Sequence, residues 1–514
     1  MEKKRDTWDS RFIFVMAAIG SAVGLGNVWR FPYTCYKYGG GAFLIPFFVA
    51  LLTAGIPLMI LEFGLGHKMR AAAPLAFRCI RKKYEWVGWF AVLTGLFVMT
   101  YYGVVMGWCF RYLAYAFNMA WGNDTQDFFY NGVLQLSGGI GDIGAPVGWT
   151  VFGLFLCWLG VFFSIVKGVK SVGKVVMWTV PVPVILLLAF VIRGVTLPGA
   201  MDGLSYYLTP DLKALLDWEV WLQAYGQVFF SLSIGFGVMI AYGSFLSEDS
   251  DVTNNAFITC LADAGICFMA GFAVFSTLGY LAFTEGKEVA EVVKSGPGLA
   301  FVTYPLIINK LHFIPQAFGV MFFLLLLTLG IDSAFSLVEA GVAGSIDKWG
   351  FNRVSVNAII SFLAFAIGVL YTTRAGLYWL DIVDFYLTNY GLAIVGLLEC
   401  VLVGYVYGAD KIREHVNRTS EIRIGVWWDL CIKIVTPVIL LWMILAKLLN
   451  VNGIIAKLAG RGPEGAPWRE ILFNPPYEGY PAWAQMAGGW GLLLALFVAA
   501  LIISSVKSRR DGNA

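Results

Sequence analysis

Charged side chains are scarce in this sequence. Asp, Glu, Lys and Arg together make up 13% of its 514 residues, whereas a soluble protein carries about 25%. Hydrophobic residues reach 59%, and the mean hydropathy is +0.74. This composition excludes an ordinary soluble domain and indicates a chain that lies in a lipid bilayer. The net charge of +3 is small for this length and indicates no nucleic-acid partner.

Histidine and paired cysteines are also rare. The three histidines (His67, His312 and His415) are scattered along the chain, which argues against a histidine-based metal centre. The eight cysteines include no C-x-x-C pair and lie mostly in apolar segments, so we expect small buried side chains rather than a disulfide framework. With neither a metal cluster nor a nucleophile–base pair suggested by the sequence, we expect no enzymatic activity.

What the sequence has in abundance is long apolar segments. A membrane-spanning helix needs about 20 apolar residues. Twelve segments meet this requirement, at 12–37, 41–68, 88–118, 147–166, 172–193, 221–246, 255–282, 315–345, 355–373, 377–407, 425–449 and 483–506. We therefore predict an all-α polytopic membrane protein with twelve transmembrane helices.

The distribution of Lys and Arg predicts the orientation of these segments. Both chain ends and the connections at 68–83, 167–174 and 411–423 are basic, and alternate crossing puts all of them on one side. The connection at 119–146 lies on the other side and contains neither Lys nor Arg. Because basic loops stay in the cytoplasm, we expect both termini to be cytoplasmic and the protein to lie in the plasma (inner) membrane.

The first apolar segment contains an unusual break. Three glycines (Gly20, Gly24 and Gly26) fall within seven residues, and Asn27 and Arg30 follow. Glycine weakens a helix by about 1 kcal/mol relative to alanine. A helix broken at membrane depth exposes backbone carbonyl and N–H groups, which persist there only if they are bound. Na⁺ can bind the carbonyls, and a carboxylate can bind the N–H groups.

A similar but weaker glycine pattern, Gly235-Phe236-Gly237, occurs five segments later. An odd number of crossings gives the two halves opposite topology, and glycine breaks at matching positions of inverted halves point to a transporter's binding site. The predicted organisation is an N-terminus at 1–11, a first repeat at 12–193, an extracellular loop at 194–220, an inverted second repeat at 221–407, two further helices within 408–506 and a tail at 507–514.

A third feature is an aspartate in an apolar segment. Leu329, Asp332 and Ser333 are spaced i, i+3 and i+4, so they share one helix face. An aspartate in a membrane span costs about 2.5–3.5 kcal/mol, so it should face a partner. The partner is either a cation or a hydrogen-bond donor on a neighbouring helix.

These features together resemble the neurotransmitter:sodium symporter family, in particular its prokaryotic, LeuT-like amino-acid transporters. The resemblance rests on Gly20–Pro32, Gly39–Phe43, Tyr101-Tyr102, Asp202–Leu204, Gln227–Gly237, Leu329–Ser333, and Asp381 with Asp384. It implies a 5+5 inverted repeat with broken helices 1 and 6. It also implies a sodium-coupled symporter that works by alternating access.

The resemblance implies two sodium sites. The first consists of Ala22, Asn27, Ser231 and Asp263, and the second of Gly20, Val23, Leu329, Asp332 and Ser333. Many relatives have asparagine where this chain has Asp263. Chloride-dependent relatives use two hydroxyl side chains at positions that are Phe47 and Cys267 here. We hypothesise that Asp263 replaces chloride; the alternative is that it is protonated and only hydrogen-bonded.

The resemblance also implies a substrate site. Monoamine transporters carry an aspartate at the position of Gly24, so its absence favours a ligand with its own carboxylate. The implied binding residues are Ala22, Leu25, Gly26, Val98, Tyr102, Phe230, Ser231, Ser233, Phe236, Ser333, Ser336 and Leu337. Since this lining is mostly apolar, we predict a neutral hydrophobic or aromatic L-amino acid.

Further residues match the gates of the family. Arg30 with Asp384 resembles the outer ion pair, with Tyr102 and Phe236 as an aromatic lid below it. Arg5 with Asp347 resembles the inner pair, covered by Trp8; the supporting tyrosine of many relatives is Phe245 here. Glu62 and Glu399 are expected to hold the backbone of the broken helices, and Gly173 and Pro183 to let the fifth span unwind.

Two alternatives differ in function class. An ion channel would need a continuous polar pore, whereas the polar residues here gather at one midplane cluster between two gates. A sodium-dependent amino-acid sensor without transport activity would use the same binding residues, so this alternative stays open. The sequence leaves the choice between a monomer and a homodimer open as well.

Overall fold

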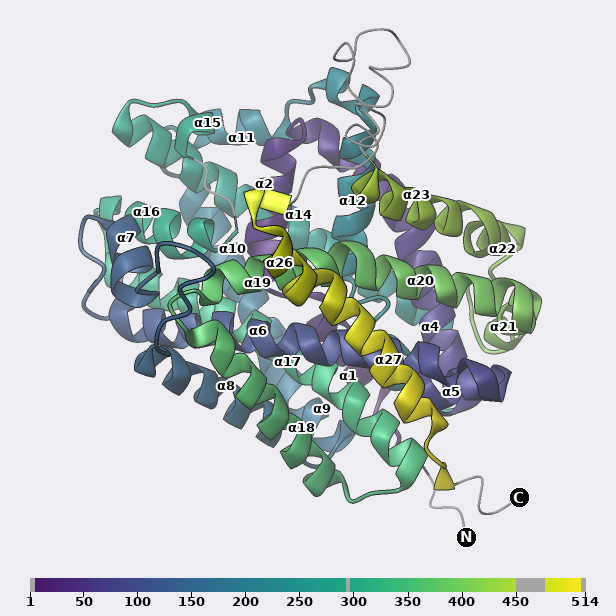
Figure 1. Cartoon of the computed structure of the whole chain (residues 1–514). Helices are drawn as coiled ribbons and strands as arrows, with labels where there is room; N and C mark the ends of the chain where they lie inside the picture. The colour runs from purple at the N-terminus through teal and green to yellow at the C-terminus, as the bar shows by residue number, and fades with distance from the viewer. Residues whose placement is uncertain (1–4, 293–295, 450–476, 510–514) are drawn as a thin grey trace, which may run out of the picture.

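The computed structural model describes residues 5–292, 296–449 and 477–509. The first four and last five residues, which belong to the predicted cytoplasmic ends, lie outside the described residues. Within these ranges the chain is helical, and its β structure is limited to the isolated bridges Gly40–Pro210 and Pro146–Thr373. Figure 1 shows long helices packed side by side in one bundle.

Ten uninterrupted helical runs are long and apolar enough to cross a membrane. They are Gly41–Met69, Lys82–Ala116, Gly148–Ile165, Val169–Val195, Val252–Glu285, Pro315–Trp349, Arg353–Thr372, Gly376–Val416, Val426–Leu448 and Ala482–Ser505. These runs confirm a polytopic all-α membrane protein and agree with ten of the predicted segments.

The first predicted segment is broken where its glycines predict. It forms α1 (Arg11–Ala22) and α2 (Leu25–Lys37), which meet at a bend of 50° and can be counted together as an eleventh span. The extended backbone of Val23 and Gly24 separates the two helices.

The sixth segment is broken more widely. A linker of six residues, 232–237, separates helix α12 (Trp218–Ser231) from α13 (Val238–Gly243). Three residues of this linker have positive φ, namely Ser233 (54°), Gly235 (81°) and Gly237 (73°). Glycine takes this conformation without strain. Each half is shorter than a bilayer crossing, so the predicted count of twelve depends on taking α12 and α13 as one interrupted span.

The long connections fold into short helices, as expected for caps outside the membrane. The 194–220 connection contains α11 (Ala200–Leu208), and the 283–314 connection contains α15 (Val289–Val292) and α16 (Tyr304–Lys310). In Figure 1 these helices gather on one side of the bundle, away from α5 (Ala73–Ile80).

Two helices form the centre of the bundle. Helices α6 (Glu85–Ala116) and α17 (Pro315–Trp349) make the most extensive helix pair of the described chain. The other long helices used below are α4 (Ile56–Met69), α9 (Val169–Thr179), α10 (Pro181–Val195), α14 (Val252–Glu285), α18 (Arg353–Gly368), α20 (Leu392–Val401), α21 (Ala409–Val416) and α27 (Gly491–Ser505). Helix α27 crosses the front of the bundle in Figure 1 and packs on α6.

Small residues let α4 approach α13 closely. A Cβ atom on Gly66 would lie 2.0 Å from the carbonyl oxygen of Ile240, and one on Gly243 would lie 2.6 Å from that of Phe63. Close backbone contact at small residues is how helices associate in membranes. The broken second half of the sixth segment is therefore held against an intact neighbouring helix.

Gly66→Ala is expected to destabilise the fold by about 1–3 kcal/mol, because the added methyl group forces α4 and α13 apart. The measurement is thermal unfolding of the purified protein in detergent. Gly265→Ala on α14 is the matched control, since its Cβ would meet nothing within 4 Å. Equal melting temperatures for the two variants would show that this contact does not hold α13.

Candidate functional site

A cavity lies where the two interrupted segments meet α6 and α17. It is lined by Ala22, Gly24, Leu25, Gly26, Asn27, Val98, Tyr102, Phe230, Ser231, Ser233, Phe236, Ser333 and Leu337. Eleven of the twelve predicted substrate residues are in this set. Ser336 is not: it is fully buried behind the cavity, where it accepts a hydrogen bond of 2.8 Å from the Ser21 hydroxyl.

Gly24 lines this cavity close to Ser333 and Tyr102. A Cβ atom there would lie 2.8 Å from Ser333 Oγ and 3.4 Å from the Tyr102 hydroxyl. A side chain at this position would therefore have to displace the Ser333 hydroxyl. The Tyr102 hydroxyl lies 3.5 Å from the backbone N–H of Leu25, the first residue of α2. A helix N-terminus and a hydroxyl donor together suit an anionic group.

The residues of the first predicted sodium site converge beside the cavity. Asn27 Nδ2 donates to Asp263 Oδ1 (2.7 Å) and to Ser231 Oγ (3.1 Å). Ser231 Oγ lies 2.8 Å from both oxygens of Asp263, which projects from α14. These side chains are buried, and the partners of the carboxylate are neutral donors. A buried carboxylate without a protein cation favours a bound cation.

Asn27 also holds the end of the break. Its Oδ1 accepts a hydrogen bond of 2.9 Å from the Gly24 N–H, and its Nδ2 lies 3.0 Å from Cys267 Sγ. Cys267 thus contacts the same cluster, with its sulfur as a weak acceptor. The cluster combines two oxygen-bearing neutral side chains with one full negative charge.

The second predicted sodium site surrounds a separate small cavity. Gly20, Val23, Leu329 and Asp332 line it, together with Pro183 of α10. A Cβ atom on Gly20 would lie 2.6 Å from Asp332 Oδ2, so glycine is required for this approach. Ser333 Oγ lies 3.4 Å from the Val23 carbonyl. The five predicted residues are therefore neighbours across α1 and α17.

Thr179 is a functional candidate that the sequence analysis missed. Its hydroxyl donates to Asp332 Oδ1 at 2.6 Å and lines the same cavity. The residue ends α9, and Val180, whose backbone is helical, joins it to α10, so the junction of the two helices lies beside this aspartate. The sequence signal was the neighbourhood of Pro183, but sequence spacing gives no indication that Thr179 faces α17.

Serine side chains and one glutamate bind the backbone that the breaks expose. The Ser21 carbonyl accepts hydrogen bonds from Ser233 Oγ (2.8 Å) and Ser333 Oγ (3.3 Å). Glu62 Oε1 accepts from the Gly235 N–H at 2.8 Å. Glu399 of α20 is fully buried next to Glu62, and no hydrogen bond joins it to the linker backbone among the described residues.

The ion pair predicted between Arg5 and Asp347 is present. Arg5 Nη1 lies 2.6 Å from Asp347 Oδ1, and Arg5 Nη2 donates to Ser244 Oγ at 2.7 Å. The guanidinium lies 4.5 Å from the centre of the Phe245 ring, which gives a cation–π contact in place of a tyrosine hydroxyl. Trp8 packs edge-on against Phe245 and donates to the Tyr242 carbonyl, so it covers the pair.

The outer pair is arranged differently from the expectation. Asp384 Oδ1 accepts a hydrogen bond of 2.7 Å from Tyr101, and the Arg30 guanidinium lies 4.7 Å above the centre of the Phe230 ring. Among the ion pairs of the described residues, none joins Arg30 to Asp384. In this conformation Arg30 therefore packs on an aromatic ring, whereas Arg5 forms an ion pair with Asp347.

Another buried ion pair was not predicted. Arg353 of α18 binds both oxygens of Glu339 in a bidentate arrangement, at 2.7 and 2.9 Å. Glu339 lies two turns before Asp347 on α17, at the cytoplasmic end by the predicted orientation. A glutamate inside an apolar segment was the available signal, since such a charge needs a partner.

The comparisons with known proteins agree with this geometry. A model of the sodium:neurotransmitter symporter family matches residues 5–125 and 121–510. The chain belongs to this family. A sodium-dependent transporter of Methanocaldococcus jannaschii is 44% identical over 87% of this chain and 91% of its own length. A creatine transporter of Torpedo marmorata is 36% identical over 96% of this chain and 83% of its own length. A taurine transporter of Bos taurus is 33% identical over 98% of this chain and 85% of its own length.

Membership of the sodium:neurotransmitter symporter family defines the class of protein. The chain is a multi-pass membrane protein and a sodium-dependent transporter. Because the family consists of sodium-coupled transporters, it agrees with the expectation that the protein is not an enzyme.

Thr179→Val is expected to weaken sodium binding about tenfold or more, because a hydrogen bond to a charged group contributes about 1.5–3 kcal/mol. The Na⁺ concentration that gives half-maximal thermal stabilisation in detergent measures this change. Thr179→Ser keeps the hydroxyl and is the matched control. If Thr179→Val requires no more Na⁺ than this control, the hydroxyl has no part in the sodium site.

Proposed function

We propose that this protein couples the inward movement of Na⁺ to the uptake of a neutral, hydrophobic or aromatic L-amino acid. The observation that carries the proposal is the chemistry of the central cavity. Its thirteen lining side chains, all among the described residues, include none with a formal charge. A lining without charged side chains therefore suits a ligand whose own positive and negative groups cancel to zero net charge.

The two ends of the cavity support a zwitterion. At one end, the N–H groups that begin α2 and the Tyr102 hydroxyl suit the carboxylate. At the other end, the carbonyls of Ala22 and Phe230 and the hydroxyls of Ser231 and Ser333 suit the ammonium group. Creatine and taurine, named for two relatives, also combine an acidic and a cationic group, so they belong in the competition experiments.

The rest of the cavity supports an apolar side chain on the substrate. Val98, Phe236 and Leu337 provide its hydrophobic surface, and Phe230 is covered by Arg30 on the outer side. A lining of this kind with a few placed polar groups is typical of small-molecule sites. We propose that Phe236 and Tyr102 close over the substrate as the aromatic lid.

Two sodium ions are proposed to move with the substrate. The first would bind at Ala22, Asn27, Ser231 and Asp263, and the second at Gly20, Val23, Leu329, Asp332 and Ser333. Each set contains one carboxylate whose hydrogen-bond partners are neutral. Two charges crossing a potential of 100 mV supply about 4.6 kcal/mol, at ~2.3 kcal/mol per charge.

Alternating access is proposed to follow from the two gates. The broken helices α1 and α12–α13 would rock against α6 and α17 within two inverted repeats. With both termini in the cytoplasm of the plasma membrane, the Arg5–Asp347 pair seals the inner side and must separate for release. In this proposal the outer gate closes when Arg30 leaves Phe230 and pairs with Asp384.

The first experiment is uptake into proteoliposomes under an inward Na⁺ gradient, with a labelled mixture of L-amino acids and either chloride or gluconate. Uptake that needs Na⁺ and ignores chloride is the expected result. Competition with single amino acids, creatine and taurine then identifies the substrate. Binding that needs Na⁺ without any uptake would favour a sensor, and the absence of both would overturn the proposed substrate class.

Amidating the carboxylate of the best amino-acid substrate is expected to weaken binding at least a hundredfold. The amide removes the negative charge that the start of α2 and Tyr102 would bind, and charge-assisted hydrogen bonds are roughly twice as strong as neutral ones. Competition against the labelled amino acid measures the loss. The N-methylated amino acid, which keeps its carboxylate, is the control. Equal binding of acid and amide would contradict the carboxylate-first orientation.

Asp263→Asn is expected to raise the Na⁺ concentration for half-maximal uptake at least tenfold in gluconate, with partial recovery in chloride. Unit charges 4 Å apart attract by about 4 kcal/mol at an effective dielectric constant of 20, so removing the carboxylate leaves a place for an anion. Asp202→Asn, an exposed aspartate of α11, is the control. If chloride stimulated uptake by the wild-type protein, this result would contradict the hypothesis that Asp263 replaces chloride.

A further inference from the structure

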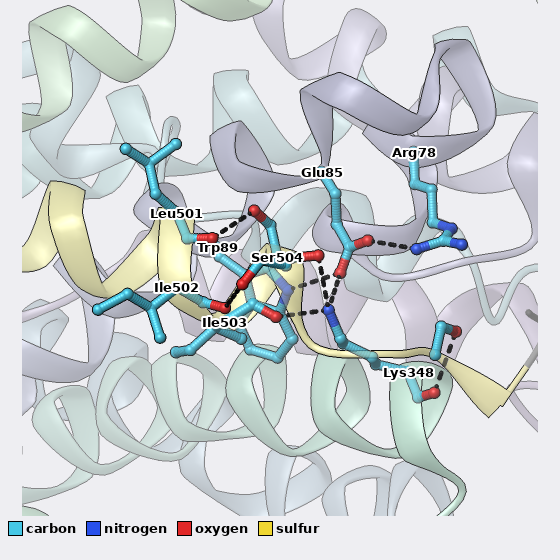
Figure 2. Close-up of polar contacts among 10 residues, drawn as sticks. Arg78, Glu85, Trp89, Lys348, Leu501, Ile502, Ile503 and Ser504 are labelled. Carbon is cyan, nitrogen blue, oxygen red and sulfur yellow. Dashed lines mark hydrogen bonds and ion pairs between the residues drawn. The ribbon is translucent and has the colours of Figure 1, made fainter.

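A buried charge cluster lies outside the cavities, at the ends of four helices (Figure 2). Glu85, the first residue of α6, lies at the centre of this cluster. Its Oε1 is 2.6 Å from Lys348 Nζ, and its Oε2 is 2.7 Å from Arg78 Nη1. Trp89 donates to the same carboxylate from one turn further along α6 (3.0 Å). The side chains of Lys348 and Glu85 are only 3% and 2% exposed, so this is a desolvated ion pair.

Lys348 also binds the end of the last helix. Its ammonium group donates to the carbonyls of Ile503 (2.6 Å) and Ser504 (3.3 Å), as Figure 2 shows. The last carbonyls of a helix have no partner within the helix, and a cation is favoured there by the helix dipole. In return, the Ser508 hydroxyl donates to the Lys348 carbonyl (3.2 Å). All three ammonium protons of Lys348 thus have acceptors.

The residue before Lys348 belongs to the inner gate. Asp347 binds Arg5 through Oδ1 and accepts the Ala72 N–H through Oδ2 at 2.7 Å. Ala72 directly precedes α5, and Arg78 lies within α5. The short helix α5 is therefore tied at its beginning to Asp347 and near its end to Glu85. The first tie is made by α17 itself, and the second reaches the last turn of α17 through the Glu85–Lys348 pair.

We propose that Lys348 is a positioning residue of the inner gate. By binding Glu85 and the end of α27, it fixes the last turn of α17, so that Asp347 stays aligned with Arg5. The inference rests on the proposed alternating access, and it gives α27, which does not line the central cavity, a role in gating. A change at the end of α27 would then alter how readily the cytoplasmic side opens.

The physical case rests on the cost of burying these charges. A buried ion pair often contributes no net stability, because apolar residues of similar volume perform as well or better. Removing one partner alone, however, leaves an uncompensated charge and destabilises strongly. The pair is therefore poorly explained by stability. The pair joins α6 to α17 one residue from Asp347 and binds two further helices, α5 and α27, which supports a role in holding that residue.

The experiment is hydrogen–deuterium exchange of the full-length protein in detergent with Na⁺ present. The variants are Lys348→Met, Lys348→Arg and the double variant Glu85→Gln with Lys348→Met, which removes the charges as a pair. Lys68→Met is the matched control, because Lys68 also donates to a carbonyl of another helix, that of Lys411 in α21, but lies apart from this cluster. The readout is exchange in peptides covering residues 5–22, with α6 as the internal reference.

We expect exchange in residues 5–22 to be at least fivefold faster in Lys348→Met and in the double variant, with α6 unchanged. Lys348→Arg keeps the charge and the donors and should stay within twofold of the wild type, as should Lys68→Met. Should Lys348→Met fail to fold, the double variant decides.

Wild-type exchange at residues 5–22 in the double variant would overturn the proposal. So would faster exchange throughout α6, since the cluster would then hold the fold rather than the gate. The readout needs neither substrate nor uptake. The uptake experiment therefore tests the proposed transport function, whereas hydrogen–deuterium exchange at residues 5–22 tests the role of Lys348 separately.

Discussion

The constraint on which this structure depends is that backbone polar groups in a bilayer must find partners inside the protein. Two segments break their helices at membrane depth and expose such groups. Ser233 and Ser333 bind the Ser21 carbonyl, and Glu62 binds the Gly235 N–H. The groups that these side chains leave free face the central cavity. The break is thus both the weakest point of the helices and the part that can bind a ligand.

Buried carboxylates in this protein fall into two kinds. Glu339 and Glu85 each bind a cationic side chain directly, and both lie toward the ends of helices, where they connect elements. Asp263 and Asp332 have only neutral hydrogen-bond donors, and both lie beside the breaks. An uncompensated carboxylate is costly in a membrane unless a cation joins it. Under the proposed function, Asp263 and Asp332 are available to a transported ion, whereas Glu339 and Glu85 connect helices.

Much of the candidate site could be predicted because glycine spacing and helical period are local properties. The breaks follow from Gly20, Gly24 and Gly26, and the shared face of Leu329, Asp332 and Ser333 follows from 3.6 residues per turn. The family resemblance placed Ser336 in the substrate site, but this side chain lies outside the cavity lining and accepts a hydrogen bond from Ser21 instead. The expected Arg30–Asp384 pair is not formed in this structure, because Arg30 packs on Phe230 and Asp384 accepts a hydrogen bond from Tyr101.

The sequence by itself determined the membrane environment, the positions of the breaks and the residue types at the cavity, because apolar length, glycine and charge act within single segments. Only the tertiary structure decided which helices face one another. Thr179 reaches Asp332 across 153 positions of sequence, and Lys348 reaches Glu85 across 263. A periodic pattern shows which residues share a face of one helix. Which neighbour that face meets is decided by packing between helices, and packing is a property of the whole bundle.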